Sequence, residues 1–124
     1  MAAARKKLIH VSFVCPGGII DSRNMREGFL ARVQQERLLG NLQDTTITSD
    51  HRSFRDIPEP TKPKPDVVVV ARHDGLNSLE VLASSLIDFE RQHGHKPLLI
   101  LKPYPSPHIL LQHILDLHSG KSHN

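Results

Sequence analysis

The chain has 124 residues, of which 38% are apolar, and its net charge is +3. That length suits one domain, and the sequence contains no run of ~18 apolar residues that could cross a membrane. His10 and Ser12 interrupt the first apolar stretch, which argues against a secretory signal. The lone cysteine, Cys15, excludes an intrachain disulfide and favours a reducing compartment, so we expect a cytoplasmic protein, with the mitochondrial matrix as the alternative.

The first part of the chain predicts a strand, a helix and a second strand. Residues 7–14 form a mostly apolar run, which is typical of a strand covered on both faces, and the Cys-Pro-Gly-Gly sequence at 15–18 breaks it. Residues 22–39 predict a helix, because apolar residues recur every four positions, and Gly40 ends it. The Thr and Ile content of residues 45–49 predicts a short strand near a sheet edge.

The middle of the chain predicts a crossover loop, a central strand and a second helix. Four prolines in residues 50–65 predict an extended, non-helical segment that is open to proteases. The valine-rich run 66–71 has no polar alternation, so we expect a strand buried on both faces at the centre of a parallel sheet. Asn77 is expected to cap the following helix together with Glu80, and Gly94 to end it.

The last part predicts a strand and a helix. Residues 98–101 are again continuously apolar and predict a fourth strand. After the turn that begins at Lys102, Ser106 is expected to cap the last helix, with Pro107 in its first position and Gly120 at its end.

This alternation of strands and helices predicts an α/β protein. We expect a three-layer, flavodoxin-like domain over 1–124, with a four-stranded parallel sheet in the order 2-1-3-4 and helices on both faces. Residues 1–6 are expected to be a flexible basic start, 50–65 the crossover loop and 120–124 a frayed tail.

In open parallel sheets, ligands bind beyond the carboxyl ends of the strands, where the strand order reverses. Three predicted loops meet there, over residues 15–22, 71–77 and 102–106. A thiol at Cys15, close to a helix start and to arginines, has features that favour a reactive thiolate, although a lone cysteine is also commonly a small buried apolar residue. Candidate anion-binding groups on these loops are Gly17, Gly18, Ser22 and Lys102.

The first loop resembles the phosphate loop of low-molecular-weight tyrosine phosphatases. The resemblance rests on Cys15-x-Gly17, on the sequence MREGFL at 25–30 and on Pro103-Tyr104. It implies a phosphoryl-transfer enzyme in which Cys15 is the nucleophile. The strand order and length are also similar to the cysteine-phosphorylated IIB domains of sugar-transport systems, although their loops are rich in Ser and Thr and this loop has only Ser22.

The sequence departs from the phosphatase pattern at two positions. Asp21 stands where the family has its phosphate-binding arginine, so Arg23 would have to take that role. Lys102 stands where the family has its general acid. A carboxylate repels phosphate, and a lysine does not protonate a leaving group as an aspartic acid does.

The second half of the chain resembles the receiver domains of response regulators. The resemblance rests on residues 65–71, on 75–82 and on Lys102-Pro103-Tyr104. Ala71 stands where a working receiver has its phosphoacceptor aspartate, which implies a pseudo-receiver that is not phosphorylated in the usual way. A third resemblance, to thioredoxin-like assembly subunits of a large mitochondrial complex, rests on residues 22–26.

Because both enzyme-like resemblances lack residues that carry the chemistry, we expect a non-catalytic module for protein–protein interaction in signalling or complex assembly. The alternative is the cysteine-dependent enzyme, with Cys15 and Arg23 as its catalytic residues. The residues expected on the interaction rim are His73, Asp74, Asn77 and Tyr104.

The expected partner is a protein, contacted through the basic first helix, since residues 1–40 hold seven basic and three acidic groups. Phosphate or another anion is a further candidate ligand, and no membrane partner is expected. A chain with no Trp and only five Phe and Tyr residues lacks the aromatic platform that stacks nucleic-acid bases. We also expect no cofactor and no metal ion, because no two of the nine histidines have the i, i+4 spacing of a helical metal site.

Overall fold

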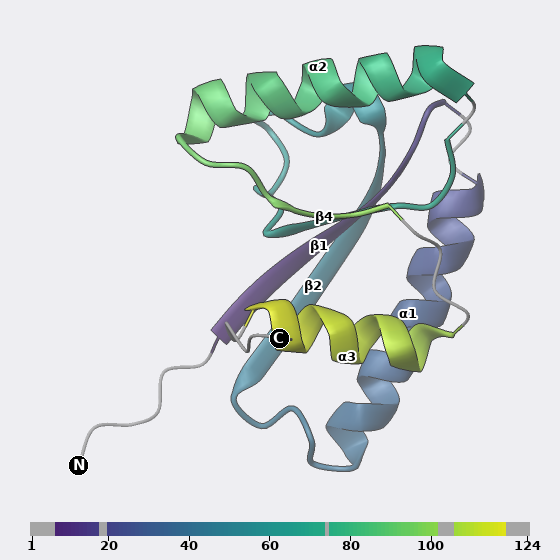
Figure 1. Ribbon diagram of the computed structural model, residues 1–124. Helices are drawn as coiled ribbons and strands as arrows, with labels where there is room; N and C mark the ends of the chain where they lie inside the picture. Colours follow the sequence, from purple (N-terminus) through teal and green to yellow (C-terminus); the bar gives the residue numbers. More distant parts are fainter. Residues whose placement is uncertain (1–6, 18–19, 74, 102–105, 119–124) are drawn as a thin grey trace.

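The computed structural model describes residues 7–17, 20–73, 75–101 and 106–118. The elements follow one another in the order β1 (Lys7–Cys15), α1 (Ile20–Leu38), β2 (Thr45–Ser53), the 3₁₀-helix η1 (Phe54–Asp56), β3 (Val67–Val70), α2 (Gly75–His93), β4 (Leu98–Ile100) and α3 (Pro107–His118). The strands form a parallel sheet in the order β2-β1-β3-β4, which confirms the predicted α/β fold and strand order (Figure 1).

Helices cover both faces of the sheet, so the fold has three layers (Figure 1). The helices α1 and α3 pack on one face, where Phe13 of β1 contacts Phe29 of α1 in an apolar cluster that also includes Ile114 of α3. On the other face, α2 and η1 form a second cluster around Val68 and Phe89. None of the helices in the described part of the chain is long and apolar enough to span a membrane.

The valine strand lies at the centre of this arrangement. All four residues of β3 are buried, and the strand pairs with β1 on one side and with β4 on the other. A β-branched run without polar alternation is what a strand covered on both faces requires, so the prediction for this element is confirmed.

The second strand is longer than predicted. It continues past Ser49 to Ser53, pairs with β1 over its whole length, and runs directly into η1. Residues 50–53 are therefore extended, as expected, but they belong to the sheet and not to a crossover loop. Residues 54–56 form a 3₁₀-helix, so the expectation of a non-helical segment was wrong for these three residues. The cause is that the polar side chains of β2 find partners on the sheet, so a strand without an apolar pattern is still stable there.

The apolar run at 98–101 behaves differently from β3. Leu98 and Leu99 of β4 are 37% and 39% exposed, and Leu101, just beyond the strand, is 46% exposed. The reason is position: in the described part of the chain β4 pairs only with β3, so it is an edge strand. A continuous apolar pattern is shared by buried strands and by exposed apolar edges, and the sequence does not separate the two.

Two helix starts differ from the predictions and one agrees. Helix α1 begins at Ile20, two residues before the predicted start at Ser22, so Asp21 also lies on the helix. Helix α2 begins at Gly75, so Asn77 lies inside its first turn and is not the capping residue. Ser106 caps α3 as expected, because its Oγ accepts a hydrogen bond of 3.3 Å from the backbone N–H of Ile109.

The expected helix ends at Gly40 and Gly94 are confirmed. Both glycines follow their helices with positive φ angles of 82° and 79°. The expected end at Gly120 lies outside the described residues, as do the segments 1–6 and 120–124.

Candidate functional site

A pocket with a volume of about 640 Å³ lies at the carboxyl end of the sheet, and we call it the α1–α3 pocket. Its walls come from the first turns of α1 and α3, from the end of β3 with Ala71, Arg72 and His73, and from Leu101 after β4. Segments that follow β1, β3 and β4 thus meet at one rim, as ligand sites in open parallel sheets do. The sequence predicted a site at this rim, formed by the segments after the first, third and fourth strands, and the pocket lining includes residues from all three segments, such as Asp21, Ala71 and Ser106.

An ion pair lies at the rim of this pocket. Arg72 Nη1 and Asp21 Oδ2 are 3.0 Å apart, and their side chains are 58% and 46% exposed. From the sequence, Asp21 was expected only to repel phosphate, and Arg72 was not among the predicted site residues. The signal that could have found Arg72 is its position directly after the central strand, next to Ala71.

The four residues expected on the interaction rim do not all lie at the α1–α3 pocket or within the described residues. His73 is exposed and lines the α1–α3 pocket. Asn77 is exposed on α2, but it does not line that pocket. Asp74 and Tyr104 lie outside the described residues.

Cys15 does not line the α1–α3 pocket. Cys15 is 1% exposed, and its Sγ donates to the Oγ of buried Ser22 at 3.5 Å. Neither residue lines the α1–α3 pocket, and Arg23 is exposed on α1 without lining it either. Among the candidate catalytic and anion-binding residues, the structure therefore brings Cys15 and Ser22 together but does not join them with Arg23 in one cavity.

The candidate anion cradle is only partly described. Gly17 is exposed, and a Cβ atom added there would meet nothing within 4 Å, so nothing packs closely against this position. Gly18 and Lys102 lie outside the described residues.

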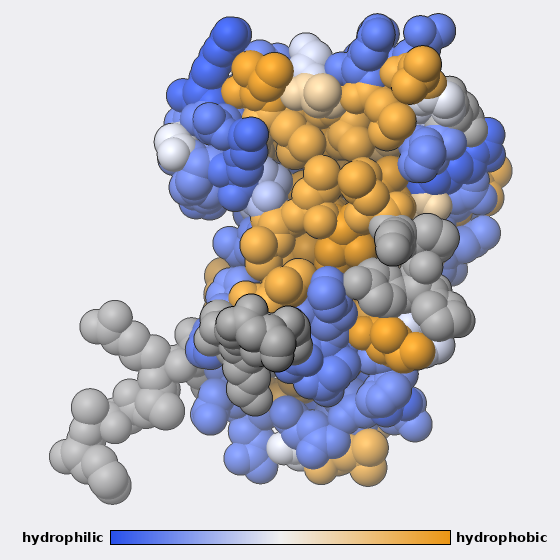
Figure 2. All heavy atoms as spheres, viewed as in Figure 1, coloured by the Kyte–Doolittle hydropathy of each residue, from blue (hydrophilic) through white to orange (hydrophobic). Residues whose placement is uncertain are grey.

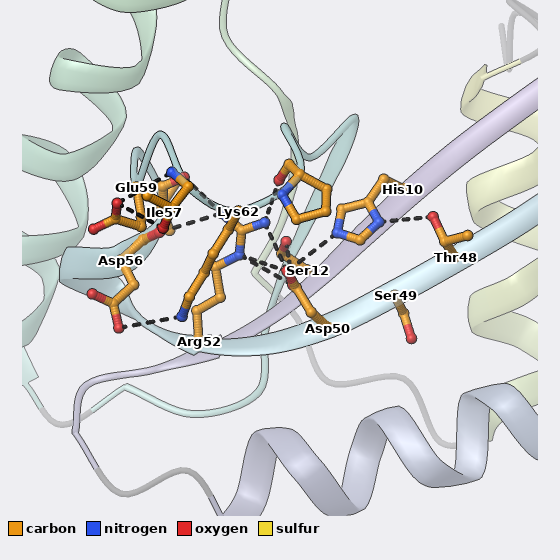
Figure 3. A network of polar contacts seen from close by, with 12 residues as sticks. His10, Ser12, Thr48, Ser49, Asp50, Arg52, Asp56, Ile57, Glu59 and Lys62 are labelled. Carbon is orange, nitrogen blue, oxygen red and sulfur yellow. Dashed lines mark hydrogen bonds and ion pairs between the residues drawn. The ribbon is translucent and has the colours of Figure 1, made fainter.

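A polar network that sequence analysis missed crosses β1 and β2 (Figure 3). Its centre is the carboxylate of Asp50, which accepts a hydrogen bond of 2.7 Å from Ser12 Oγ and lies 3.3 Å from His10 Nε2. The other ring nitrogen of His10 is 2.8 Å from Thr48 Oγ1. Hydroxyl, imidazole and carboxylate thus follow one another along the sheet, but none of these residues lines the α1–α3 pocket.

Arg52 joins this network to the crossover segment. Its guanidinium contacts the Asp50 carboxylate and donates to the carbonyl oxygens of Asp56 at 3.2 Å and Ile57 at 3.0 Å, and also to that of Pro63 (Figure 3). The Arg52 side chain is completely buried. The arrangement supplies donors to a proline-rich segment whose carbonyl groups have few backbone N–H groups nearby to bind.

These contacts shift the ionisation of Asp50. Burial raises the pKa of its carboxyl group, but contacts with His10, Arg52 and Ser12 outweigh burial and hold that pKa well below its usual value. Asp50 is therefore a carboxylate under ordinary conditions and a fixed partner for the buried arginine. The sequence signal for this pair was the spacing of Asp50 and Arg52, because residues two apart on a strand share a face.

The edge of the sheet carries an apolar surface. We call Leu98, Leu99 and Leu101 the β4 surface. Figure 2 shows apolar side chains gathered in a continuous band that runs from α2 across this edge of the sheet. Contiguous exposed apolar area is a common mark of interaction sites.

The described residues contain no group of three or more His, Cys, Asp or Glu side chains that could hold a metal ion. Comparison with known proteins found no matching family model, curated protein or solved structure. The function proposed below therefore rests on the geometry of the chain itself.

Proposed function

We propose that the chain is a non-catalytic interaction module that binds a partner protein through the β4 surface. In this proposal the flavodoxin-like fold serves as a pseudo-receiver scaffold in signalling or complex assembly. Cys15 is buried and forms no disulfide, which fits a reducing environment and favours the cytoplasm as the compartment.

The exposure of the β4 surface is the observation that carries this proposal. Leu98 and Leu99 are 37% and 39% exposed on β4, an edge strand among the described residues, and Leu101, just beyond it, is 46% exposed. An open strand edge offers backbone N–H and C=O groups to another chain, and an extended peptide that adds to such an edge gains both these hydrogen bonds and apolar contacts.

The charges around this strand indicate what the partner looks like. In the sequence, Lys96 and Lys102 bracket the apolar run at 98–101. A second copy paired with this strand would set one lysine-flanked run against another, and like charges near each other are destabilising. The occupant we propose is therefore an extended apolar segment of a different protein, flanked by acidic residues.

The basic first helix, from which a protein contact was also expected, is a weaker candidate. Two of its arginines are engaged within the chain: Arg26 donates to Ser49 Oγ at 2.9 Å, and Arg32 pairs with Glu36. The charge that remains free to attract a partner along α1 is thus smaller than the sequence suggests.

The alternative function, cysteine-dependent phosphoryl transfer, has less support. This chemistry needs an accessible thiolate with a cation close to it. Cys15 is buried, and Arg23 is exposed on α1 and does not line the pocket. The contact between Cys15 Sγ and Ser22 Oγ, at the start of α1, is the feature that keeps this alternative open to test.

A photo-crosslinking amino acid placed at position 99 tests the proposed function. In cells that produce the full chain, we expect a discrete adduct with a second protein, and no such adduct from the same group placed at exposed Gln35 on α1. The purified partner should then bind Leu99→Lys at least about tenfold more weakly than it binds the unmodified chain or Gln35→Lys.

Three results would overturn the proposal. These are the absence of a discrete adduct at position 99, an adduct formed only with another copy of the chain, and a partner whose affinity Leu99→Lys leaves unchanged.

A further inference from the structure

Among the described residues, the α1–α3 pocket combines apolar walls with the Asp21–Arg72 ion pair at its rim. Among the wall residues, Val69 and Leu110 are buried in the core and Met25 packs against it, while Leu101 faces the pocket from the end of β4. Its volume of about 640 Å³ lies within the ~300–1,000 Å³ range of small-molecule sites. The ligand must therefore have a substantial apolar part.

The rim ion pair can open without much cost. Asp21 and Arg72 are both about half exposed, and an exposed ion pair contributes at most ~1 kcal/mol to stability. If a ligand entered and covered these side chains without replacing their partners, the buried charges would be strongly unfavourable. A ligand that offers a cation to Asp21 and an anion to Arg72 replaces the contact between these two side chains.

We propose that the α1–α3 pocket binds a free α-amino acid with a large apolar side chain. The ammonium group of the ligand pairs with the Asp21 carboxylate, its carboxylate pairs with the Arg72 guanidinium, and its side chain lies against Met25, Val69 and Leu110. Phosphate fits less well, because the Asp21 carboxylate repels it at the same rim.

This site shares Leu101 with the β4 surface, but its ligand is recognised by different residues. A ligand in the pocket is recognised by the rim pair, whereas the partner is recognised by the exposed faces of Leu98 and Leu99. Either proposal can therefore fail while the other stands.

Calorimetric titration of the full chain with phenylalanine, leucine and methionine tests the inference. We expect saturable binding of at least one of them below about 10 mM. N-acetylphenylalanine lacks the ammonium group, and phenylalaninamide lacks the carboxylate. Each should bind at least about tenfold more weakly than phenylalanine, and inorganic phosphate should not bind at this site.

Three variants make the test specific. Ala71→Trp fills the pocket and should abolish binding, whereas Ala31→Trp, on the exposed side of α1, should not change it. Asp21→Asn removes the partner of the ammonium group and keeps Arg72 for the carboxylate, so the preference for phenylalanine over N-acetylphenylalanine should fall at least about tenfold. Loss of a purely structural contact would weaken both ligands alike and leave that preference unchanged.

The inference is overturned if none of the three amino acids binds saturably, if N-acetylphenylalanine or phenylalaninamide binds as well as phenylalanine, or if Asp21→Asn leaves the preference unchanged. Unchanged binding to a folded Ala71→Trp variant, judged by its circular dichroism spectrum, would also overturn it.

Discussion

The guanidinium of Arg52 and the carboxylate of Asp50 lie 2.7 Å apart on one face of β2, and the arginine side chain is completely buried. The pair lies between two parts of the fold. Through Asp50 it reaches Ser12 on β1, and through Arg52 it reaches the carbonyl groups of the crossover segment at Ile57 and Pro63. The buried arginine and its partly buried partner therefore determine the path of the chain between β2 and β3.

Replacing Arg52 with methionine should strongly destabilise the fold. Arg52→Met leaves a partly buried carboxylate at Asp50 without its cation and removes the donors from three carbonyl groups. Breaking a buried pair by removing one partner costs about 3–5 kcal/mol. We expect a loss of this size in the free energy of unfolding, measured by urea denaturation.

Arg55 provides a matched control, since it is exposed on η1, three residues along the chain. Arg55→Met should change the free energy of unfolding by no more than about 0.5 kcal/mol. Equal stability of the two variants would show that the Arg52 contacts do not hold the crossover segment.

The low pKa of Asp50 predicts a loss of stability in acid. The folded state lowers this pKa relative to the unfolded chain, so the carboxylate stabilises the fold above the unfolded pKa of about 4, and this contribution disappears as the pH falls below that value. Asp50→Asn should therefore destabilise the protein at pH 7, and the difference from the unmodified protein should shrink below about pH 4. Urea denaturation at a series of pH values measures this.

Asp44→Asn is the control for this pH series, because Asp44 is exposed. Its difference in stability from the unmodified protein should stay nearly constant with pH. If the difference for Asp50→Asn were equally constant, the carboxylate of Asp50 would not carry the acid sensitivity.

The sequence predicted the fold well because the buried strands carry unambiguous patterns. The valines of β3 have no polar alternation, and a single packing arrangement satisfies them. Helix ends at Gly40 and Gly94 were also predictable, because the backbone there adopts positive φ angles that glycine tolerates best.

The rest depended on contacts between residues far apart in the chain. The end of β2 at Ser53 follows from Asp50 meeting Ser12 across the sheet, which no local propensity encodes. The rim pair likewise joins Arg72 to a residue that precedes it by 51 positions. Sequence periodicity placed the carboxyl ends of the strands at one rim, but it did not show which side chains meet there or that Cys15 is buried.

Substitutions at Gly94 should lower the stability by an amount that depends on how well the new residue tolerates a positive φ angle. Gly94 has a φ of 79°, and a Cβ atom there would meet nothing within 4 Å, so a substitution changes only the backbone preference. Gly94→Ala should cost about 1–2 kcal/mol in the free energy of unfolding, and Gly94→Asn should cost less, because Asn enters this conformation more readily than Ala. Thermal and urea denaturation of the two variants measures the difference; an equal cost for both would contradict the assignment of the loss to φ.

The burial of Cys15 predicts that its thiol reacts slowly with alkylating reagents. With 1% of the residue exposed, alkylation by iodoacetamide in the folded protein should be at least about tenfold slower than in the unfolded protein, since a buried thiol reacts only after local opening. Cys15→Ala combined with Ser84→Cys places the thiol on an exposed position of α2 and should react at the unfolded rate. Folded-state labelling of Cys15 as fast as that control, slowed by phosphate or vanadate, would instead favour the cysteine-dependent enzyme, because only an accessible thiol in an anion site shows both properties.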